Sequence, residues 1–191
     1  MTIGSHQQTI GASQSHFTPG WIIDRLGPFD LDPCAGDPRP WDCARVNYTL
    51  ADDGLSKRWL GLTWLNPPFC RYVVERWIQR LADHGNGVAL LHARCEAQWF
   101  RPVWANASGI LFMGQRIKFC HADGIEHPAN SGAPPVLVSF GAEALKRIQA
   151  SGIEGALVER WIWQTERARP HAAPQQYVEQ KMAGPGPAQV S

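Results

Sequence analysis

The sequence has almost no net charge, because its 18 lysines and arginines nearly balance its 17 aspartates and glutamates. An overall basic field is therefore missing, and any contact with nucleic acid would need a local patch of positive charge. The five cysteines include no C-x-x-C pair, and no secretory signal precedes them. This pattern argues against zinc and dithiol redox motifs, and it predicts reduced thiols in the cytoplasm and no bound metal.

Long hydrophobic runs and internal repeats are also absent. No apolar stretch approaches the roughly 20 residues that a transmembrane helix needs, so no membrane association is expected. The 191 residues suffice for one domain with its own core, which we take to be a monomer. We predict this domain over residues 17–166, with disordered tails in the polar residues 1–16 and the Pro/Ala/Gln/Gly-rich residues 167–191.

Apolar, β-prone runs alternate with stretches of helical spacing along the domain, which is typical of an α/β fold. Strands are predicted at residues 29–32, 62–65, 88–91 and 136–140, and a hairpin from residues 109–113 and 116–119. Helices are predicted over residues 19–26, 72–84, 95–105 and 142–150. Residues 38–61 show no regular pattern, and residues 155–164 fit either a strand or a helix.

Two polar residues close predicted strands. Asp32 ends the run that begins at Phe29, and Asn66 follows the run that ends at Leu65. In a parallel sheet, these positions lie along one carboxyl edge, where α/β proteins bind nucleoside-type ligands. A ligand held by Asp32 and a second one held by Asn66 would then be neighbours.

The tetrapeptide Asn66-Pro67-Pro68-Phe69 suits the recognition of an exocyclic amine on a flat ring. The two prolines prevent both helix and strand pairing and have no N–H to donate. An amide oxygen and a backbone carbonyl are left as neighbouring acceptors beside an aromatic face. If both amine hydrogens bind these acceptors, the nitrogen lone pair is free to attack an electrophile.

The tetrapeptide resembles the catalytic motif of S-adenosylmethionine-dependent amino-methyltransferases. Its surroundings are similar to the phage and prophage type of DNA adenine-N6 methyltransferase (Dam-like), in order, from about residue 17 to residue 141. The resemblance implies a Rossmann-like methyltransferase sheet, catalysis by Asn66, Pro67, Pro68 and Phe69, and a role in phage DNA methylation or restriction-modification. It implies a double-stranded DNA partner with a flipped-out adenine stacked on Phe69, in a bacterial or phage-infected cytoplasm.

The same resemblance implies which residues hold the cofactor, S-adenosylmethionine. Phe17-Thr18-Pro19 would hold its methionine end, with Thr18 as N-cap of a helix that starts at Pro19. Asp32-Pro33-Cys34-Ala35 corresponds to the family's cofactor motif, although only Gly36 of the fuller glycine-rich form is present. Asp53, in Asp-Gly-Leu, would lie near the cofactor's adenine. The acidic residue that grips the ribose is not identified, and Asp42 is a weak candidate.

DNA contacts are expected from residues 92–108 and 114–133, with Arg94, Arg116 and Lys118 as candidates and Arg101 as a further one. One departure lies here, because residues 92–97 read His-Ala-Arg-Cys-Glu-Ala where the family more often has Pro-Ala-Arg-Thr-Asp-Thr. The sequence leaves two other functions open. One is methylation of a protein glutamine or an RNA base, and the other is non-catalytic DNA binding by a derivative of the fold.

Overall fold

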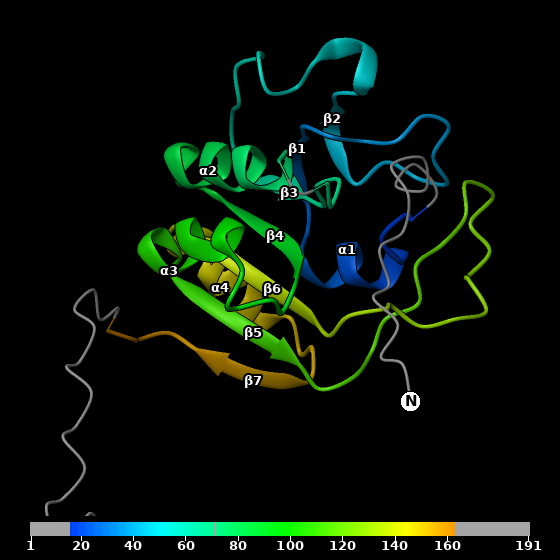
Figure 1. The fold of residues 1–191 in the computed structure, drawn as a ribbon. Coiled ribbons are helices and arrows are strands. Elements are labelled where there is room, and N and C mark those ends of the chain that lie inside the picture. The colour runs from blue at the N-terminus through cyan, green and yellow to red at the C-terminus, as the bar shows by residue number, and fades with distance from the viewer. Residues whose placement is uncertain (1–15, 71, 163–191) are drawn as a thin grey trace, which may run out of the picture. The chain divides into compact units, whose positions relative to one another are not determined.

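The computed structural model describes residues 16–70 and 72–162, and it has a seven-stranded sheet with helices on both faces (Figure 1). The strand order is β2-β1-β3-β4-β6-β5-β7. Pairing is parallel from β2 to β4 and antiparallel from β4 through β6 and β5 to β7. The predicted α/β class, with a Rossmann-like methyltransferase sheet, is confirmed.

The described part of the chain contains seven strands and four α-helices. The strands are β1 (Phe29–Asp32), β2 (Ala44–Asn47), β3 (Thr63–Leu65), β4 (Gly87–His92), β5 (Gly109–Met113), β6 (Pro135–Phe140) and β7 (Gly155–Val158). The helices are α1 (Gly20–Leu26), α2 (Val74–His84), α3 (Arg101–Asn106) and α4 (Ala142–Ala150), with single 3-10 turns η2 (Leu50–Asp52) and η3 (Gln98–Phe100). None of the helices in this described part of the chain is long and apolar enough to cross a bilayer.

The sheet separates two hydrophobic cores, because successive side chains of a strand point to opposite faces. In β4, Val88 and Leu90 join the core that contains α1 and α4, whereas Ala89 and Leu91 join the core that contains α2 and α3. The helices are therefore sorted into two layers. The continuous apolar run of β4 is explained by burial on both faces.

Helix α1 begins differently from the prediction. Pro19, not Thr18, is the N-cap residue, and no side chain caps the helix. The Thr18 hydroxyl instead accepts a hydrogen bond from the Asn66 side chain. Thr18 was predicted to cap its own helix, but its hydroxyl instead bonds to the loop after β3, 48 residues away in the sequence.

The predicted hairpin is wrong in its second half. Residues 116–119 form no strand, and β5 lies between β6 and β7. The carbonyls of Ile117 and Phe119 accept hydrogen bonds from Ser131 and His127, so this segment pairs with its own following loop. Two further differences concern short elements: β2 was not predicted, and the helix expected over residues 95–105 is reduced to η3 and α3. The undecided stretch contains strand β7.

Candidate active site

The residues singled out at the two strand ends lie at one edge of the sheet. Strands β1 and β3 are parallel neighbours, with Leu31 in register with Thr63. Asp32 is the last residue of β1, and Asn66 directly follows β3. Cys34 also connects the two ends, because its Sγ donates to the Asn66 carbonyl oxygen over 3.3 Å. The carboxyl edge thus brings both predicted sites together.

The side chain of Asn66 is held by its nitrogen. Nδ2 donates to Thr18 Oγ1 over 3.2 Å and to the His16 carbonyl oxygen over 3.3 Å. Thr18 is 2% exposed, so this contact is shielded from water. With both amide hydrogens engaged, Oδ1 is left as an acceptor that receives no hydrogen bond from a described residue.

The backbone of the tetrapeptide supplies a second acceptor. The carbonyl of Asn66 already receives the Cys34 thiol, and the carbonyl of Pro68 receives the Cys70 N–H over 2.9 Å. Among the described residues, none donates to the carbonyl of Pro67, which lies between them. The loop therefore offers two open acceptors, Asn66 Oδ1 and the Pro67 carbonyl oxygen.

Phe69 lies against an imidazole that the sequence did not single out. Its ring is parallel to that of His92, with centroids 3.9 Å apart and planes 9° apart, and Trp99 meets it edge-on at 6.3 Å. Burial, helped by Arg94 and Arg116, lowers the pKa of His92 to about 4, so the imidazole is neutral at neutral pH. The only signal in the sequence was that His92 opens the segment that departs from the family pattern.

Asp32 is a buried carboxyl group that forms no ion pair with a described residue. It is 6% exposed, and Oδ1 accepts the Cys34 N–H over 3.0 Å. Burial raises the pKa of Asp32 to about 7, although the Cys34 N–H and the charge of Arg39 oppose the shift. Arg39 itself pairs with Asp42 over 2.6 Å. A positively charged ligand at Asp32 would offset the cost of this burial.

The remaining candidate cofactor residues are packed around Asp32-Pro33-Cys34-Ala35. The Phe17 ring covers Gly36 so closely that a Cβ there would collide with it, and a Cβ on Gly54 would collide with the Pro33 carbonyl. Gly54 thereby brings the neighbouring Asp53 to this loop. Asp53 adopts a left-handed conformation with φ of 51°, and its side chain is exposed.

Pro19 and Ala35 are the last two candidate cofactor residues. Asp42, the weak candidate for binding the ribose, already has two hydrogen-bond partners. Pro19 lies next to Thr18 as the N-cap of α1, and Ala35 donates its N–H to the Tyr48 carbonyl over 2.8 Å. Asp42 pairs with Arg39 and also accepts from Asn47 over 3.2 Å, so its Oδ1 is taken. Within residues 16–70 and 72–162, no cluster of side chains could hold a metal ion.

Two of the candidate DNA contacts are close to the His92 ring that stacks on Phe69. The charges of Arg94 and Arg116 both help to lower the pKa of His92. Arg116 also donates to the Ser131 carbonyl over 2.7 Å, which ties it to the loop 121–133. Lys118 is exposed on the same segment as Arg116, and Arg101 is exposed at the start of α3.

The comparisons with known proteins gave one family. The family model described as DNA N-6-adenine-methyltransferase (Dam) matches residues 15–151. No curated protein matches the chain. The matched range includes every candidate catalytic, cofactor-binding and DNA-binding residue described above.

Proposed function

Because the chain belongs to the DNA N-6-adenine-methyltransferase (Dam) family, we propose that it transfers a methyl group from S-adenosylmethionine to the N6 amine of an adenine flipped out of double-stranded DNA. Membership in the family gives the general activity, which is adenine methylation in DNA. The proposal adds the methyl donor, the flipped base and the residues that act on each.

The orientation of Asn66 carries this proposal. The amide group of an asparagine can present either its oxygen or its nitrogen, and only the oxygen can accept an N–H from adenine. Thr18 Oγ1 and the His16 carbonyl both accept from Nδ2, which leaves Oδ1 for the substrate. The Pro67 carbonyl supplies the second acceptor. Two acceptors hold both hydrogens of an NH₂ group, and they stabilise the positive charge that develops on its nitrogen during transfer.

Adenine would stack on the face of Phe69 that His92 does not cover. A base inside a duplex has its amine in the stack, so it must leave the helix to reach these acceptors. His92 supports the opposite face of Phe69 at 3.9 Å, and Trp99 supports its edge. These two rings limit rotation of Phe69, and a fixed platform sets the position of the amine relative to the acceptors.

The residues of the candidate cofactor site fit S-adenosylmethionine. This cofactor is cationic, and when bound it supplies an electrophilic methyl group on its sulfonium. Asp32 would hold the cofactor's ammonium group, because its buried carboxyl lacks an ion pair with any described residue. The other residues that would hold the cofactor are Phe17, Thr18, Pro19, Pro33, Cys34, Ala35 and Asp53. Arg94, Arg116 and Lys118 would contact DNA beside the flipped base.

The test compares acceptor classes in one experiment. Protein and labelled S-adenosylmethionine are incubated in parallel with adenine-containing duplex DNA, RNA and a glutamine-containing protein, and the products are identified by mass spectrometry. N6-methyladenine in DNA alone is the expected result. Label in protein glutamine or RNA only would replace DNA as the substrate, and no label despite cofactor binding would contradict the enzymatic proposal.

A further inference from the structure

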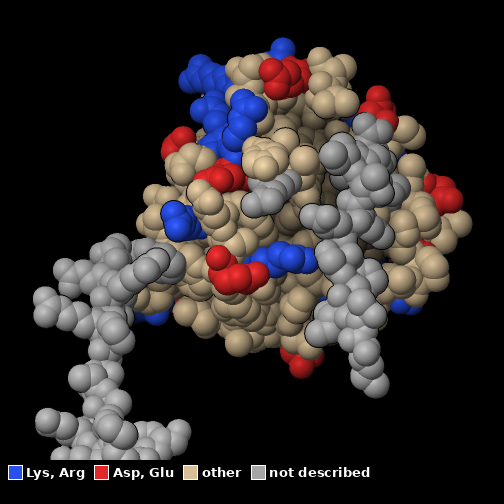
Figure 2. Space-filling view, in the orientation of Figure 1, with Lys and Arg blue, Asp and Glu red and all other residues tan. Residues whose placement is uncertain are grey.

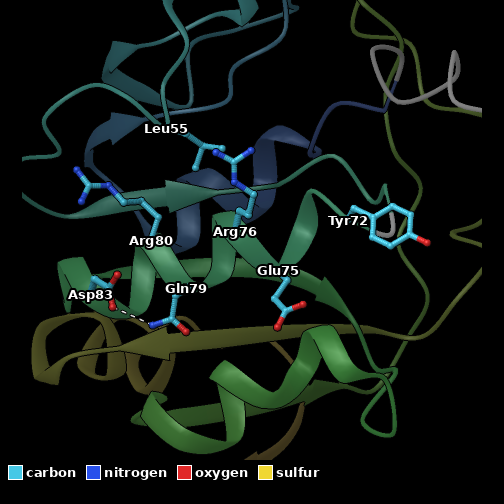
Figure 3. A pocket seen from close by; sticks show the side chains of 7 residues that line it. All are labelled: Leu55, Tyr72, Glu75, Arg76, Gln79, Arg80 and Asp83. Carbon is cyan, nitrogen blue, oxygen red and sulfur yellow. Dashed lines mark hydrogen bonds between the residues drawn. The ribbon is translucent and has the colours of Figure 1, made fainter.

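The exposed side of α2 has a hollow that belongs to none of the candidate sites (Figure 3). It has a volume of about 440 Å³ and lies between α2 and the loop that precedes β3. Its lining residues are Leu55, Tyr72, Glu75, Arg76, Gln79, Arg80 and Asp83. Figure 2 shows that lysine and arginine side chains gather on this part of the surface, above α2 and beside that loop.

One of these cations has a structural role. Arg80 donates to the Lys57 carbonyl oxygen over 3.1 Å, and its guanidinium lies 5.6 Å from the centroid of the Trp59 ring. Both contacts tie the loop to α2. Arg80 therefore keeps its charge at a fixed place, and it also holds Lys57 and Arg58 beside the helix.

The other three cations form no ion pair with a described residue, although Lys57 is close enough to Asp52 to contribute to the lowered pKa of that carboxyl. These three residues, Lys57, Arg58 and Arg76, are exposed. Figure 3 shows Arg76 pointing toward Leu55, and two acids, Glu75 and Asp83, line the same hollow. The second acid, Asp83, accepts a hydrogen bond from Gln79 over 2.8 Å. The basic residues Lys57, Arg58, Arg76 and Arg80 outnumber the two acids that line the hollow. An excess of positive charge of this kind is suited to a polyanion.

The hollow begins next to the candidate active site. Tyr72 follows Phe69 by three residues, and Leu55 follows Asp53 by two. Helix α2 then runs away from the catalytic edge, and Arg76 and Arg80 are about 6 Å apart along its axis. Duplex DNA carries a charge about every 1.7 Å of its axis, so a duplex engaged at the active site has phosphates to offer along this path.

We propose that Lys57, Arg58 and Arg76, with Arg80 behind them, bind backbone phosphates that flank the target adenine. The inference rests on the proposed function, because it takes DNA as the substrate. It adds a contact surface on the α2 side, separate from Arg94, Arg116 and Lys118. Contacts of this kind position the duplex and do not read its sequence.

The experiment compares two double variants with equal loss of charge. Arg58→Gln/Arg76→Gln removes two proposed phosphate contacts. Lys146→Gln/Arg160→Gln is the control, because both residues are exposed and without an ion pair, on α4 and just after β7. Binding of a duplex of about 25 base pairs is measured at several salt concentrations between about 50 and 200 mM. Thermal melting with and without cofactor checks that both variants fold and bind S-adenosylmethionine.

The first variant should make the slope of log affinity against log salt less steep by about 1.8, since each phosphate contact contributes about −0.9 to this negative slope. The control should keep the slope of the parent. Equal slopes in both variants would overturn this inference while leaving the proposed function intact. A parent that binds the cofactor but no duplex would overturn the proposed function as well.

Discussion

At the scale of single residues, the site depends on which atom of Asn66 faces the substrate. Thr18 is a positioning residue in this arrangement, since its Oγ1 accepts from Nδ2 over 3.2 Å. Thr18→Val keeps the size of the side chain and removes this acceptor, whereas Thr18→Ser keeps the hydroxyl. We expect the valine variant to transfer methyl groups about 2- to 10-fold more slowly, which corresponds to one hydrogen bond of about 0.5–1.5 kcal/mol.

The measurement for Thr18 separates two roles. Single-turnover rates report the orientation of Asn66, and calorimetric titration reports cofactor affinity. A slower rate with unchanged affinity in the valine variant, restored by serine, is expected. If valine instead weakens S-adenosylmethionine binding and leaves the rate at saturation unchanged, the Thr18 hydroxyl serves the cofactor and not Asn66.

A second prediction concerns the titration of Asp32. Because burial raises the pKa of Asp32 to about 7, the carboxyl is protonated below that pH in the unliganded protein. A cationic cofactor binds the ionised form, so binding at lower pH must displace a proton. Affinity for S-adenosylmethionine should therefore fall as pH drops below about 7, by at most about tenfold per pH unit, and level off only above pH 7.

Calorimetry between about pH 5.5 and 7 checks this, with Asp32→Asn as the matched variant. The asparagine variant should bind more weakly and show no such pH dependence. The same raised pKa means that the unliganded fold loses stability as pH rises from about 4 to about 7, because the unfolded chain ionises this carboxyl at lower pH. An affinity that is equally pH-dependent in both proteins would place the titrating group elsewhere.

At the scale of elements, the sequence predicted the positions of most strands in both halves of the sheet, but it did not predict strand β2 or how β5 and β6 pair. The runs at residues 29–32, 62–65 and 88–91 are apolar, and they became β1, β3 and β4. Apolarity does not encode strand direction, so the antiparallel pairing of β6 could not be read from Val136–Phe140 of the sequence alone. Strand β2 was missed because Arg45 and Val46 are exposed at the sheet edge and show no apolar run.

The site could be predicted in part, for a physical reason. Asp32 and Asn66 were found because strand ends are visible in a sequence, and parallel pairing puts them on one edge. The hydrogen bond from Asn66 to Thr18 was not predictable, because it joins residues that only the fold brings together. The same is true of the stacked rings of His92 and Phe69.

The packing of the Asp53-Gly54 turn against Pro33, just after β1, gives a stability prediction. A Cβ on Gly54 would collide with the Pro33 carbonyl, whereas a Cβ on Gly132 would meet nothing within 4 Å. Gly54→Ala should therefore lower the free energy of unfolding by about 1–3 kcal/mol, and Gly132→Ala should change it by less than about 0.5 kcal/mol. Urea unfolding of both variants is the measurement, and equal stabilities would show that the Asp53-Gly54 turn does not press on the Asp32-Ala35 loop.

At the scale of the whole molecule, near-neutral charge is compatible with DNA binding only if the charges are sorted in space. The 18 basic and 17 acidic residues give a net charge of +1. Lys57, Arg58 and Arg76 form no ion pair with a described residue, while Arg39, Arg45 and Arg147 are paired with acids. Sorting of this kind gives a face that attracts phosphate without making the whole protein basic.

The central claim is that Asn66 Oδ1 accepts a hydrogen bond from the adenine amine, and one variant tests it most directly. Methyl incorporation into adenine-containing duplex DNA is measured for the parent and for Asn66→Ala, with cofactor-induced thermal stabilisation of both as the control. We expect Asn66→Ala to transfer methyl groups about 10²–10³ times more slowly than the parent, with the stabilisation by S-adenosylmethionine retained. Normal transfer by Asn66→Ala with normal melting would contradict the account.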